Sequence, residues 1–347
     1  MAGSASSEGG KDGRGRLRSA LHSAVPSHFN DPFGLAMRIL RSGDRDAFAA
    51  VLQAALRLGL APLDAALAAL SPAAGADAPT GPLLFVTGPP RSGTTLLYQL
   101  IVRSLPVAYL TNLASLMPRS AAAGAFPLTA SIANRKVRLE SYYGRTRALS
   151  GSSDGLEFWD AWVGPDRSAV PSAIPPEAAR AMRRFFAVFE ARSGRPVVCK
   201  NNNLLAYAHL VAEALPTAHF VCLTRDPLYL AQSLLKARRD IHGDEAVGYG
   251  IAGTGSAEPA DPVDDVWRQV RFYDSLTADQ RARIGPGRFS TVSYEHLCED
   301  PAGTVGKLAA AVFGFTGIAA EIPPLRPMQR QTLADETFRR LSDRRPP

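Results

Sequence analysis

The segment Gly88–Thr95, which reads Gly-Pro-Pro-Arg-Ser-Gly-Thr-Thr, constrains the fold more than any other part of this chain. The apolar run Leu83–Val86 precedes it and predicts a buried strand. The residues from Thr94 to about Ser104 predict a helix. Small residues between a strand and a helix let backbone N–H groups approach an anion, and the helix N-terminus adds positive potential. We therefore predict a phosphate-binding loop between these two elements.

The side chains of this loop limit the phosphate chemistry. A nucleotide triphosphatase loop has two glycines separated by four residues and followed by Lys. Gly88 and Gly93 have that spacing, but Thr94 stands where Lys is required, and the basic residue is Arg91. This pattern argues against hydrolysis of ATP or GTP. The predicted donors to an anion come from Arg91, Ser92, Gly93, Thr94 and Thr95.

The strand–helix unit recurs along the chain. Further strands are predicted at Val197–Cys199, Phe220–Leu223 and Phe289–Ser293, and further helices at Leu204–Leu215, Leu228–Arg238 and Ala302–Phe313. Alternating strands and helices predict an α/β fold, a P-loop-like parallel sheet covered by helices on both faces, here with a helical N-terminal extension. Ligands of such sheets bind outside the carboxyl ends of the strands.

Two more cations follow predicted strands. Arg225 ends the strand at Phe220–Leu223, and Ser233 lies eight residues further, about two helical turns on, on the same side of the helix. Arg225 and Ser233 are therefore predicted to hold one phosphate between them. Lys200 follows the strand Val197–Cys199 and precedes Arg225 by 25 residues.

These segments resemble sulfotransferases that use 3′-phosphoadenosine 5′-phosphosulfate (PAPS). Pro90–Thr95 resembles their 5′-phosphosulfate loop, in the form with Arg instead of the more familiar Lys, as in tyrosylprotein and many bacterial members. Arg225–Ser233 is similar to their 3′-phosphate motif, and Tyr294–Pro301 to a further segment that we interpret as structural. The likeness covers roughly residues 82–315.

The resemblance implies transfer of a sulfuryl group from PAPS to an acceptor hydroxyl or amine, with no metal required. It implies that Arg91–Thr95 bind the 5′-phosphosulfate and that Arg225 and Ser233 bind the 3′-phosphate. Lys200 would contact the oxygen that bridges the sulfuryl and phosphate groups and stabilise the charge on the leaving phosphate.

The general base does not follow the patterns of the family. Cytosolic sulfotransferases have a His two residues after the Lys, where this chain has Asn202. Tyrosylprotein-type enzymes have a Glu about twenty residues after the loop Arg, where Leu110–Leu113 carries no carboxylate. The acidic-aromatic segment Ser152–Trp162 remains, because a carboxylate beside aromatic rings is partly desolvated. We favour Glu157 as the catalytic base, with Asp154 second.

Other polar residues have weaker claims. His209 lies on an apolar helical face and is interpreted as structural. The Gly-rich C-terminal loop of the family has no counterpart; Arg326 and Arg330 are candidates to replace it, with ordinary surface arginines as the alternative. A solvated helix face, or a surface that attracts anions, accounts for the basic residues Arg135, Lys136, Arg138, Arg145 and Arg147.

Composition excludes several classes of function. The net charge is +7, which by itself allows nucleic acid, a membrane surface or small anions as partners. Without aromatic residues interleaved among the basic ones, we expect no nucleic-acid binding. The three cysteines, Cys199, Cys222 and Cys298, predict neither a disulfide framework nor a zinc site, and they fit a cytoplasmic location.

The domain organisation follows from composition shifts. We predict a disordered basic N-terminus at residues 1–25, a helical extension at 26–80, the α/β domain at 81–320 and a C-terminal tail at 321–347. Arg57, Pro62 and Asp64 interrupt the apolar stretch Ala47–Leu70, which favours two short helices and no stable membrane insertion. Gly248–Val263 is predicted to be a loop, either over the active site or plainly solvated.

Two other functions remain open from sequence. A P-loop nucleotide kinase would require magnesium. A non-catalytic protein that binds PAPS or another anion would show no turnover. The acceptor is expected to be a small molecule, and its identity, like the oligomeric state, is left open by the sequence: a peptide tyrosine, a sugar, a phenol, a lipid or a secondary metabolite all fit.

Overall fold

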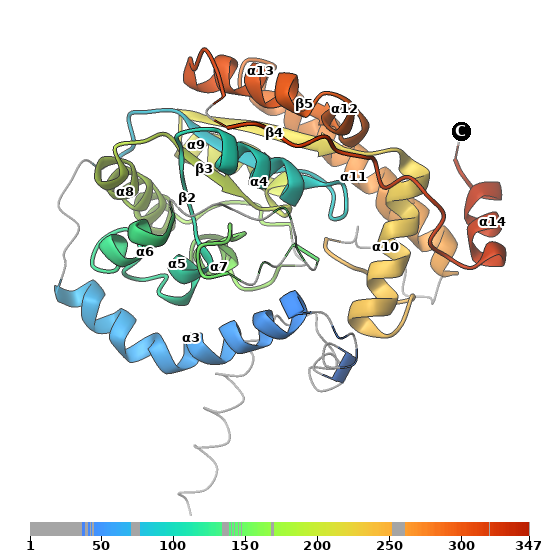
Figure 1. The fold of residues 1–347 in the computed structure, drawn as a ribbon, viewed down its shortest axis with the longest axis horizontal. Coiled ribbons are helices and arrows are strands. Elements are labelled where there is room, and N and C mark those ends of the chain that lie inside the picture. The colour runs from blue at the N-terminus through green and yellow to red at the C-terminus, as the bar shows by residue number, and fades with distance from the viewer. Residues whose placement is uncertain are drawn as a thin grey trace, which may run out of the picture.

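The computed structural model describes residues 37–38, 41, 43, 45–70, 77–133, 139, 141, 143–144, 146, 148–167, 170–251, 261–318 and 320–346. Five parallel strands form one sheet in the order β2-β3-β1-β4-β5 (Figure 1). The strands are β1 Leu83–Thr87, β2 Ala108–Tyr109, β3 Val197–Lys200, β4 Ala218–Thr224 and β5 Phe289–Ser293. The predicted α/β class and all four predicted strands are confirmed; β2, with two residues, was too short to predict.

The strand order places the loops that carry the predicted site residues together. From the central strand β1 the chain moves to β2 and β3 on one side, and then crosses to β4 and β5 on the other. In the register of the sheet, Val86 lies opposite Lys200 of β3, and Thr87 lies opposite Cys222 of β4. The carboxyl ends of β1, β3 and β4 therefore meet at the point where the strand order reverses, which is where open α/β sheets bind ligands.

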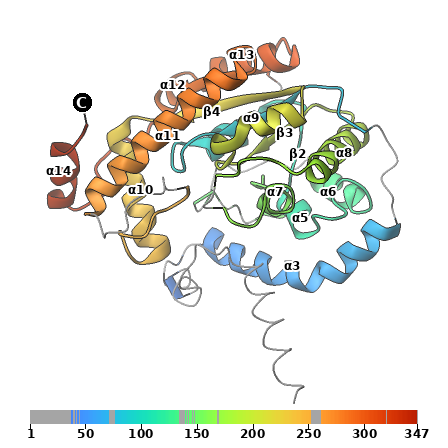
Figure 2. The ribbon, with the colours of Figure 1, turned by 180° about the vertical axis from the view of Figure 1, so that it is seen from behind.

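Helices cover both faces of the sheet, as the alternating pattern predicted (Figures 1 and 2). On one face Phe85 of β1 packs against the rings of Trp159, Phe186 and Phe220 at centroid distances of 5.4–5.9 Å. The helices on that face are α7 Leu156–Val163, α8 Pro176–Ser193, α9 Leu204–Ala214 and α11 Pro262–Ile284. The other face is covered by α4 Thr94–Ser104, α12 Tyr294–Glu299 and α13 Pro301–Phe313.

A third apolar cluster fixes the C-terminal segment. It joins α10 Pro227–His242 and α11 to α14 Asp335–Asp343. The indole N–H of Trp267 donates to the carbonyl of Leu341 at 3.0 Å, which ties α14 to α11. The region predicted as a C-terminal tail therefore holds a packed helix. The sequence patterns did not predict α8, α11 or α14.

The N-terminal helix α3, Arg45–Leu70, corrects one prediction. The apolar stretch forms one continuous helix rather than two short ones, although Pro62 lies inside it. Proline removes one helical hydrogen bond, but contacts on both sides of it hold α3 in place. Before Pro62, Leu60 packs against a small apolar core. This core includes residues of α5 (Asn112–Leu116) and is also contacted by α6 (Phe126–Ala133). After Pro62, the buried carboxylate of Asp64 accepts from the backbone N–H of Ser120 at 2.9 Å.

Within the described ranges one helix, α3 over Val51–Leu70, is long and apolar enough to cross a membrane by length and composition. One face of α3 carries Leu60 and Asp64, which contact the body of the protein. The other carries large exposed apolar side chains such as Phe48, Leu52 and Leu63. The expectation that the chain does not insert into membranes stays a prediction. The disordered N-terminus predicted for residues 1–25 lies outside the described residues.

Candidate active site

The loop Gly88–Thr95 connects β1 to α4, and its backbone leaves the start of the helix open. Arg91 adopts a φ of 72° and Gly93 a φ of 100°, both in the left-handed region. The first helical bond runs from Leu97 N–H to the Gly93 carbonyl, and no side chain caps α4. The first N–H groups of a helix have no partner within it. The loop therefore offers uncapped backbone donors at the positive end of a helix, an arrangement that suits an anion.

Two glycines are required here by close approach. At Gly88 a Cβ atom would lie 2.4 Å from the carbonyl oxygen of Leu223 in β4. At Gly93 a Cβ atom would lie 2.6 Å from the ring of Tyr294 in α12. Both contacts are shorter than side chains allow, so only glycine lets the loop pack this closely on β4 and α12.

The three hydroxyl side chains of the loop have different surroundings. Ser92 is fully buried, and its hydroxyl donates to the Pro89 carbonyl at 2.8 Å, so it fixes the turn. The Thr94 hydroxyl donates to the side-chain oxygen of Asn202 at 3.2 Å, and the Asn202 amide donates to the Gly88 carbonyl at 3.0 Å. Thr95 lies at the start of α4, half-buried. Asn202 therefore ties the turn after β3 to both ends of the loop.

Lys200 and Asp154 form a close ion pair beside the loop. The Lys200 ammonium, 3% exposed, donates to a carboxylate oxygen of Asp154 at 2.7 Å. Gly144 lies close to both this ion pair and the loop Gly88–Thr95. A Cβ atom built on Gly144 would lie 3.4 Å from the Thr95 hydroxyl. The same point lies 3.6 Å from the Lys200 nitrogen and 3.7 Å from the Asp154 carboxylate. A cation, a carboxylate and a hydroxyl thus surround one small space at the carboxyl end of β3.

Arg225, Ser233 and Arg91 also lie together, although not in the predicted arrangement. We predicted that Arg225 and Ser233 hold a phosphate between them. Here the Ser233 hydroxyl accepts from the Arg91 Nε at 3.1 Å, and the Arg225 guanidinium donates to the Arg91 carbonyl at 3.0 Å. Arg91 also lies over the ring of Tyr143, 4.5 Å from its centroid. The structure brings all three predicted residues together, with Arg91 between the other two.

The guanidinium of Arg225 has an unused donor. Its Nε atom is buried without a hydrogen-bond partner in the described part of the chain. Burial lowers the pKa of Arg225 below its ordinary value, and the nearby charge of Arg91 lowers it further. Tyr294, whose ring centroid lies 4.8 Å from the guanidinium, raises this pKa in part. A buried cation with an unpaired N–H is stabilised by a bound anion. The surroundings of Arg225 therefore fit a phosphate group.

The segment after residue 320 lies along this site. The Met328 carbonyl accepts from Arg225, and the Met328 N–H donates to the Tyr294 hydroxyl at 3.0 Å. The Gln232 side chain on α10 donates to the Arg330 carbonyl at 3.0 Å, which holds the next turn of the segment. The backbone near the candidate residues Arg326 and Arg330 is thus beside Arg225, while the roles of their side chains stay predictions.

Glu157 faces a different direction from Asp154. Its carboxylate pairs with Arg57 of α3 at 3.3 Å, and the Glu157 side chain is 11% exposed. The structure therefore brings Asp154, but not Glu157, into contact with Lys200. Asp154 lies before the N-terminus of α7, where Gly155 adopts a φ of 61°. This turn directs Asp154 towards β3 and Glu157 towards α3.

Three other predictions have a structural outcome or lie outside the described ranges. His209 pairs with Gln280 at 3.0 Å and with Arg283 at 3.2 Å, which accounts for it as a structural residue. The basic residues Arg135, Lys136, Arg138, Arg145 and Arg147 lie outside the described residues. Of the loop Gly248–Val263, residues 252–260 also lie outside them, but Gly250 packs on Pro90 of the phosphate loop.

Sequence reasoning missed two contributors to this site. Asn202 was noted only as an unsuitable base, yet its amide joins β3 to the phosphate loop. Tyr294 was assigned a structural role, yet it orders both Arg225 and the C-terminal segment. No local pattern identifies either contact, because each depends on elements that are distant in sequence. Among the described residues no group of three His, Cys, Asp or Glu side chains could hold a metal ion.

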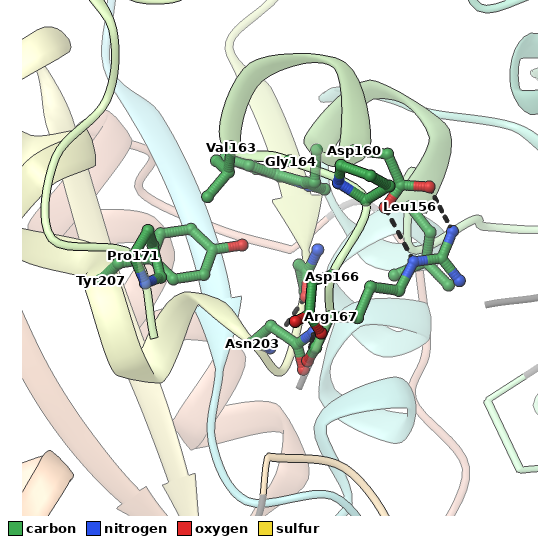
Figure 3. Close-up of a pocket in the computed structure, with 12 residues that line it drawn as sticks. Leu156, Asp160, Val163, Gly164, Asp166, Arg167, Pro171, Asn203 and Tyr207 are labelled. Atoms are coloured by element: carbon green, nitrogen blue, oxygen red, sulfur yellow. Dashed lines mark hydrogen bonds and ion pairs between the residues drawn. The ribbon is translucent and has the colours of Figure 1, made fainter. Parts of the chain in front are cut away.

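A pocket of about 170 Å³ lies next to the turn that follows Lys200 (Figure 3). Asn201 and Asn203 of that turn form one wall, and α7 forms another. Within the pocket, Arg167 makes a two-pronged pair with Asp160, with distances of 2.6 and 2.8 Å. Burial raises the pKa of Asp160, and the contact with Arg167 opposes this rise. The hydroxyl of Tyr207 points into the space that these residues enclose (Figure 3).

Comparison with known proteins identifies the family. A model of the sulfotransferase family matches residues 82–312. Sulfotransferase STF9 from Mycobacterium avium shares 14% identity at a TM-score of 0.50, with 98% of this chain and 88% of that chain covered. Sulfotransferase STF1 from Mycobacterium tuberculosis shares 18% identity at a TM-score of 0.45, with 95% and 86% covered. A sulfotransferase from Alicyclobacillus acidocaldarius shares 16% identity at a TM-score of 0.39, with 76% and 92% covered.

No curated protein matches the chain. The match to STF9 supports the fold, a single parallel α/β sheet. The family model covers two thirds of the chain and includes the loop Gly88–Thr95, Lys200, and Arg225 with Ser233. The protein therefore belongs to the sulfotransferase family.

Proposed function

We propose that this protein transfers a sulfuryl group from PAPS to an acceptor hydroxyl or amine and releases 3′-phosphoadenosine 5′-phosphate (PAP). The observation that carries this proposal is the position of Lys200. Its ammonium is buried at the end of β3 beside Thr95 of the phosphate loop, and 2.7 Å from the Asp154 carboxylate. A cation at that point stabilises negative charge that develops on a leaving phosphate.

The residues present fit PAPS at both phosphate positions. The uncapped N-terminus of α4 and the side chain of Arg91 would receive the 5′-phosphosulfate. The unpaired Nε of Arg225 and the hydroxyl of Ser233 would receive the 3′-phosphate, once Ser233 exchanges its bond with Arg91 for one with the ligand. The segment around Met328 would close this position from outside.

The reaction forms one bond and breaks one. The acceptor oxygen forms a bond to sulfur, and the bond between sulfur and the bridging oxygen breaks. The electron pair of that bond stays on the phosphate of PAP, where Lys200 neutralises it. The acceptor proton goes to a carboxylate. We propose Asp154 for this role ahead of Glu157, because Asp154 contacts Lys200 while Glu157 pairs with Arg57 on α3.

Calorimetric titration with PAP and with AMP, in buffer without magnesium, tests the proposal. The 3′-phosphate should make PAP bind at least tenfold tighter, about 1.4 kcal/mol. Arg225→Gln should remove most of that difference, while Arg281→Gln, an exposed arginine on α11, should keep it. Equal binding of PAP and AMP, or binding of neither, contradicts the proposal.

Two further measurements, magnesium dependence and turnover of an acceptor with PAPS, separate the alternative functions. A nucleotide kinase would need magnesium to bind and turn over its substrate productively. A non-catalytic binding protein would bind PAP without turnover of any acceptor. We also propose a cytoplasmic location, supported by three cysteines that are all free and buried.

A further inference from the structure

The strand β5 forms one edge of the sheet, and among the described strands it pairs with β4 alone (Figure 1). The Phe220 N–H of β4 donates to the Arg288 carbonyl, and Phe220 lies opposite Phe289 in the register. Because backbone groups alternate in direction along a strand, those of Arg288 and of every second residue after it face β4. The N–H and C=O of Thr291 therefore face outward, and neither makes a hydrogen bond within the part of the chain that the structure describes.

The sequence of β5 lacks the features that usually keep an edge strand from pairing with another chain. Such strands commonly carry Lys or Pro, contain a bulge, or are covered by another element. Phe289–Ser293 reads Phe-Ser-Thr-Val-Ser, with no charge and no proline, and its register with β4 runs without a bulge. Ser290 and Thr291 are both exposed. The outer side of β5 is therefore open to a further strand.

A groove of about 510 Å³ lies beside this edge and is lined by both β5 and α13. All five residues of β5 take part, and Leu308 and Val312 of α13 add apolar surface. Thr304 of α13 also lines the groove; it is only 3% exposed, and its hydroxyl is buried with no hydrogen-bond partner among the described residues. A space of this volume, with apolar walls and an unused polar group, has the character of a binding site.

The charges in this groove favour an anionic partner. Its lining contains two cations, Arg288 and Lys307, and no carboxylate. Arg288 donates to the backbone carbonyls of Ala212 and Pro216, which leaves its charge uncompensated, and Lys307 is exposed on α13. Carboxylates placed in the groove would therefore meet two cations and no competing acid from the lining.

Two other occupants fit these observations less well. A second copy of this chain that paired its own β5 here would bring a second Arg288 and a second Lys307 to the same interface, with no carboxylate from the lining to compensate them. A small anion would compensate the charges, but it would leave the backbone groups of Thr291 without a partner.

We propose that the edge of β5 and the groove beside it form a docking site for an extended, acidic segment of a partner protein. The segment would add a strand to the sheet through the backbone of Thr291, and its carboxylates would pair with Arg288 and Lys307. The lining of this groove includes neither the phosphate loop, Lys200 nor Arg225, so the docking site does not depend on the proposed sulfotransfer.

Binding of fluorescein-labelled decapeptides, measured by fluorescence anisotropy, tests the proposal. The probe alternates Glu and Val, and two matched peptides replace every Glu by Gln or by Lys. We expect the Glu peptide to bind at least tenfold tighter than the Lys peptide and at least threefold tighter than the Gln peptide, because only its side chains compensate the two cations.

Variants of the protein separate strand addition from simple attraction of charge. Lys307→Glu should weaken the Glu peptide at least fivefold, whereas Arg339→Glu, an equal charge change at an exposed position on α14, should leave its affinity within twofold. Thr291→Pro removes the outward N–H and keeps both cations, so it should weaken the Glu and Gln peptides alike, each at least threefold. A thermal melt of each variant checks that it is folded.

Amide hydrogen exchange of the unmodified protein gives an independent measure of the backbone contact. The Thr291 amide should exchange at least tenfold more slowly when the Glu peptide is bound. No binding of the Glu peptide, equal affinity of the three peptides, or unchanged exchange at Thr291 would each overturn the proposal. So would a dimer in light scattering that Thr291→Pro dissociates, since a second copy would then occupy the edge.

Discussion

Replacement of Asp154 by Asn should distinguish the catalytic carboxylate from its neighbour. The substitution keeps the shape of the side chain and removes its ability to accept a proton. A general base contributes about 10²–10⁴-fold to turnover, which corresponds to about 3–5 kcal/mol of transition-state stabilisation. We therefore expect kcat at saturating PAPS to fall by about 10²–10⁴-fold in Asp154→Asn.

The same substitution has a cost in stability that is worked from the ion pair. Lys200 is 3% exposed and loses its charged partner, while Asp154 is 26% exposed, so water replaces part of the interaction. We expect the free energy of unfolding to fall by about 1–3 kcal/mol, less than the cost of breaking a fully buried pair. A thermal melt therefore shows whether the loss of turnover exceeds what destabilisation explains.

Glu157→Gln is the matched control. It removes a carboxylate three residues away whose partner, Arg57, is 30% exposed. Such pairs contribute at most about 1 kcal/mol, and we expect kcat to change only a few-fold. A larger loss of kcat in Glu157→Gln than in Asp154→Asn would refute the assignment of Asp154. Small effects in both variants would exclude this acidic segment as the source of the base.

The remaining predictions concern the frame of the site and its stability. Asp64→Ala leaves the backbone donor of Ser120 without its acceptor at 2.9 Å, and should lower the free energy of unfolding by about 2–5 kcal/mol in urea titrations; a loss below about 0.5 kcal/mol contradicts this account. Asn202→Ala removes the 3.0 Å bond to the Gly88 carbonyl and should weaken PAP about tenfold in calorimetry, with unchanged affinity as the opposing result. Burial, and secondarily a nearby arginine, lower the pKa of His219 in the folded protein. As the pH falls below about 6.5, the unfolded chain therefore takes up a proton at His219 before the folded protein does, and the free energy of unfolding should decline. His219→Gln should flatten that decline in thermal melts between about pH 7.5 and 5.5.

The fold was predictable to the extent that its signals are local. The strands β1, β3, β4 and β5 are short apolar runs followed by turn residues, and each was predicted within two residues of its bounds. The helix α3 was divided incorrectly at Pro62, because local propensity takes no account of the contacts that hold both halves against the body of the protein. The helices α8, α11 and α14 depend on apolar faces that acquire meaning only when their packing partners are known.

The candidate site shows the same division at the level of single side chains. Motif spacing together with the family resemblance identified Arg91, Lys200, Arg225 and Ser233 as a group, and the sheet topology brings them to one edge. The choice between Asp154 and Glu157 was not accessible from sequence, because both carboxylates lie in one acidic-aromatic segment. The left-handed turn at Gly155 and the position of α3 direct one towards Lys200 and the other towards Arg57.

The amino-acid sequence by itself determined the α/β class, the phosphate loop and the family resemblance, because each is encoded in residues that are adjacent along the chain. Only the tertiary structure decided which side chains meet across elements: Asn202 with the loop, Tyr294 with Arg225, and Asp154 with Lys200. The pocket beside α7 also exists only in the folded protein, since its walls come from segments about forty residues apart. Contacts of this kind depend on how strands and helices pack in three dimensions, and no local pattern specifies them.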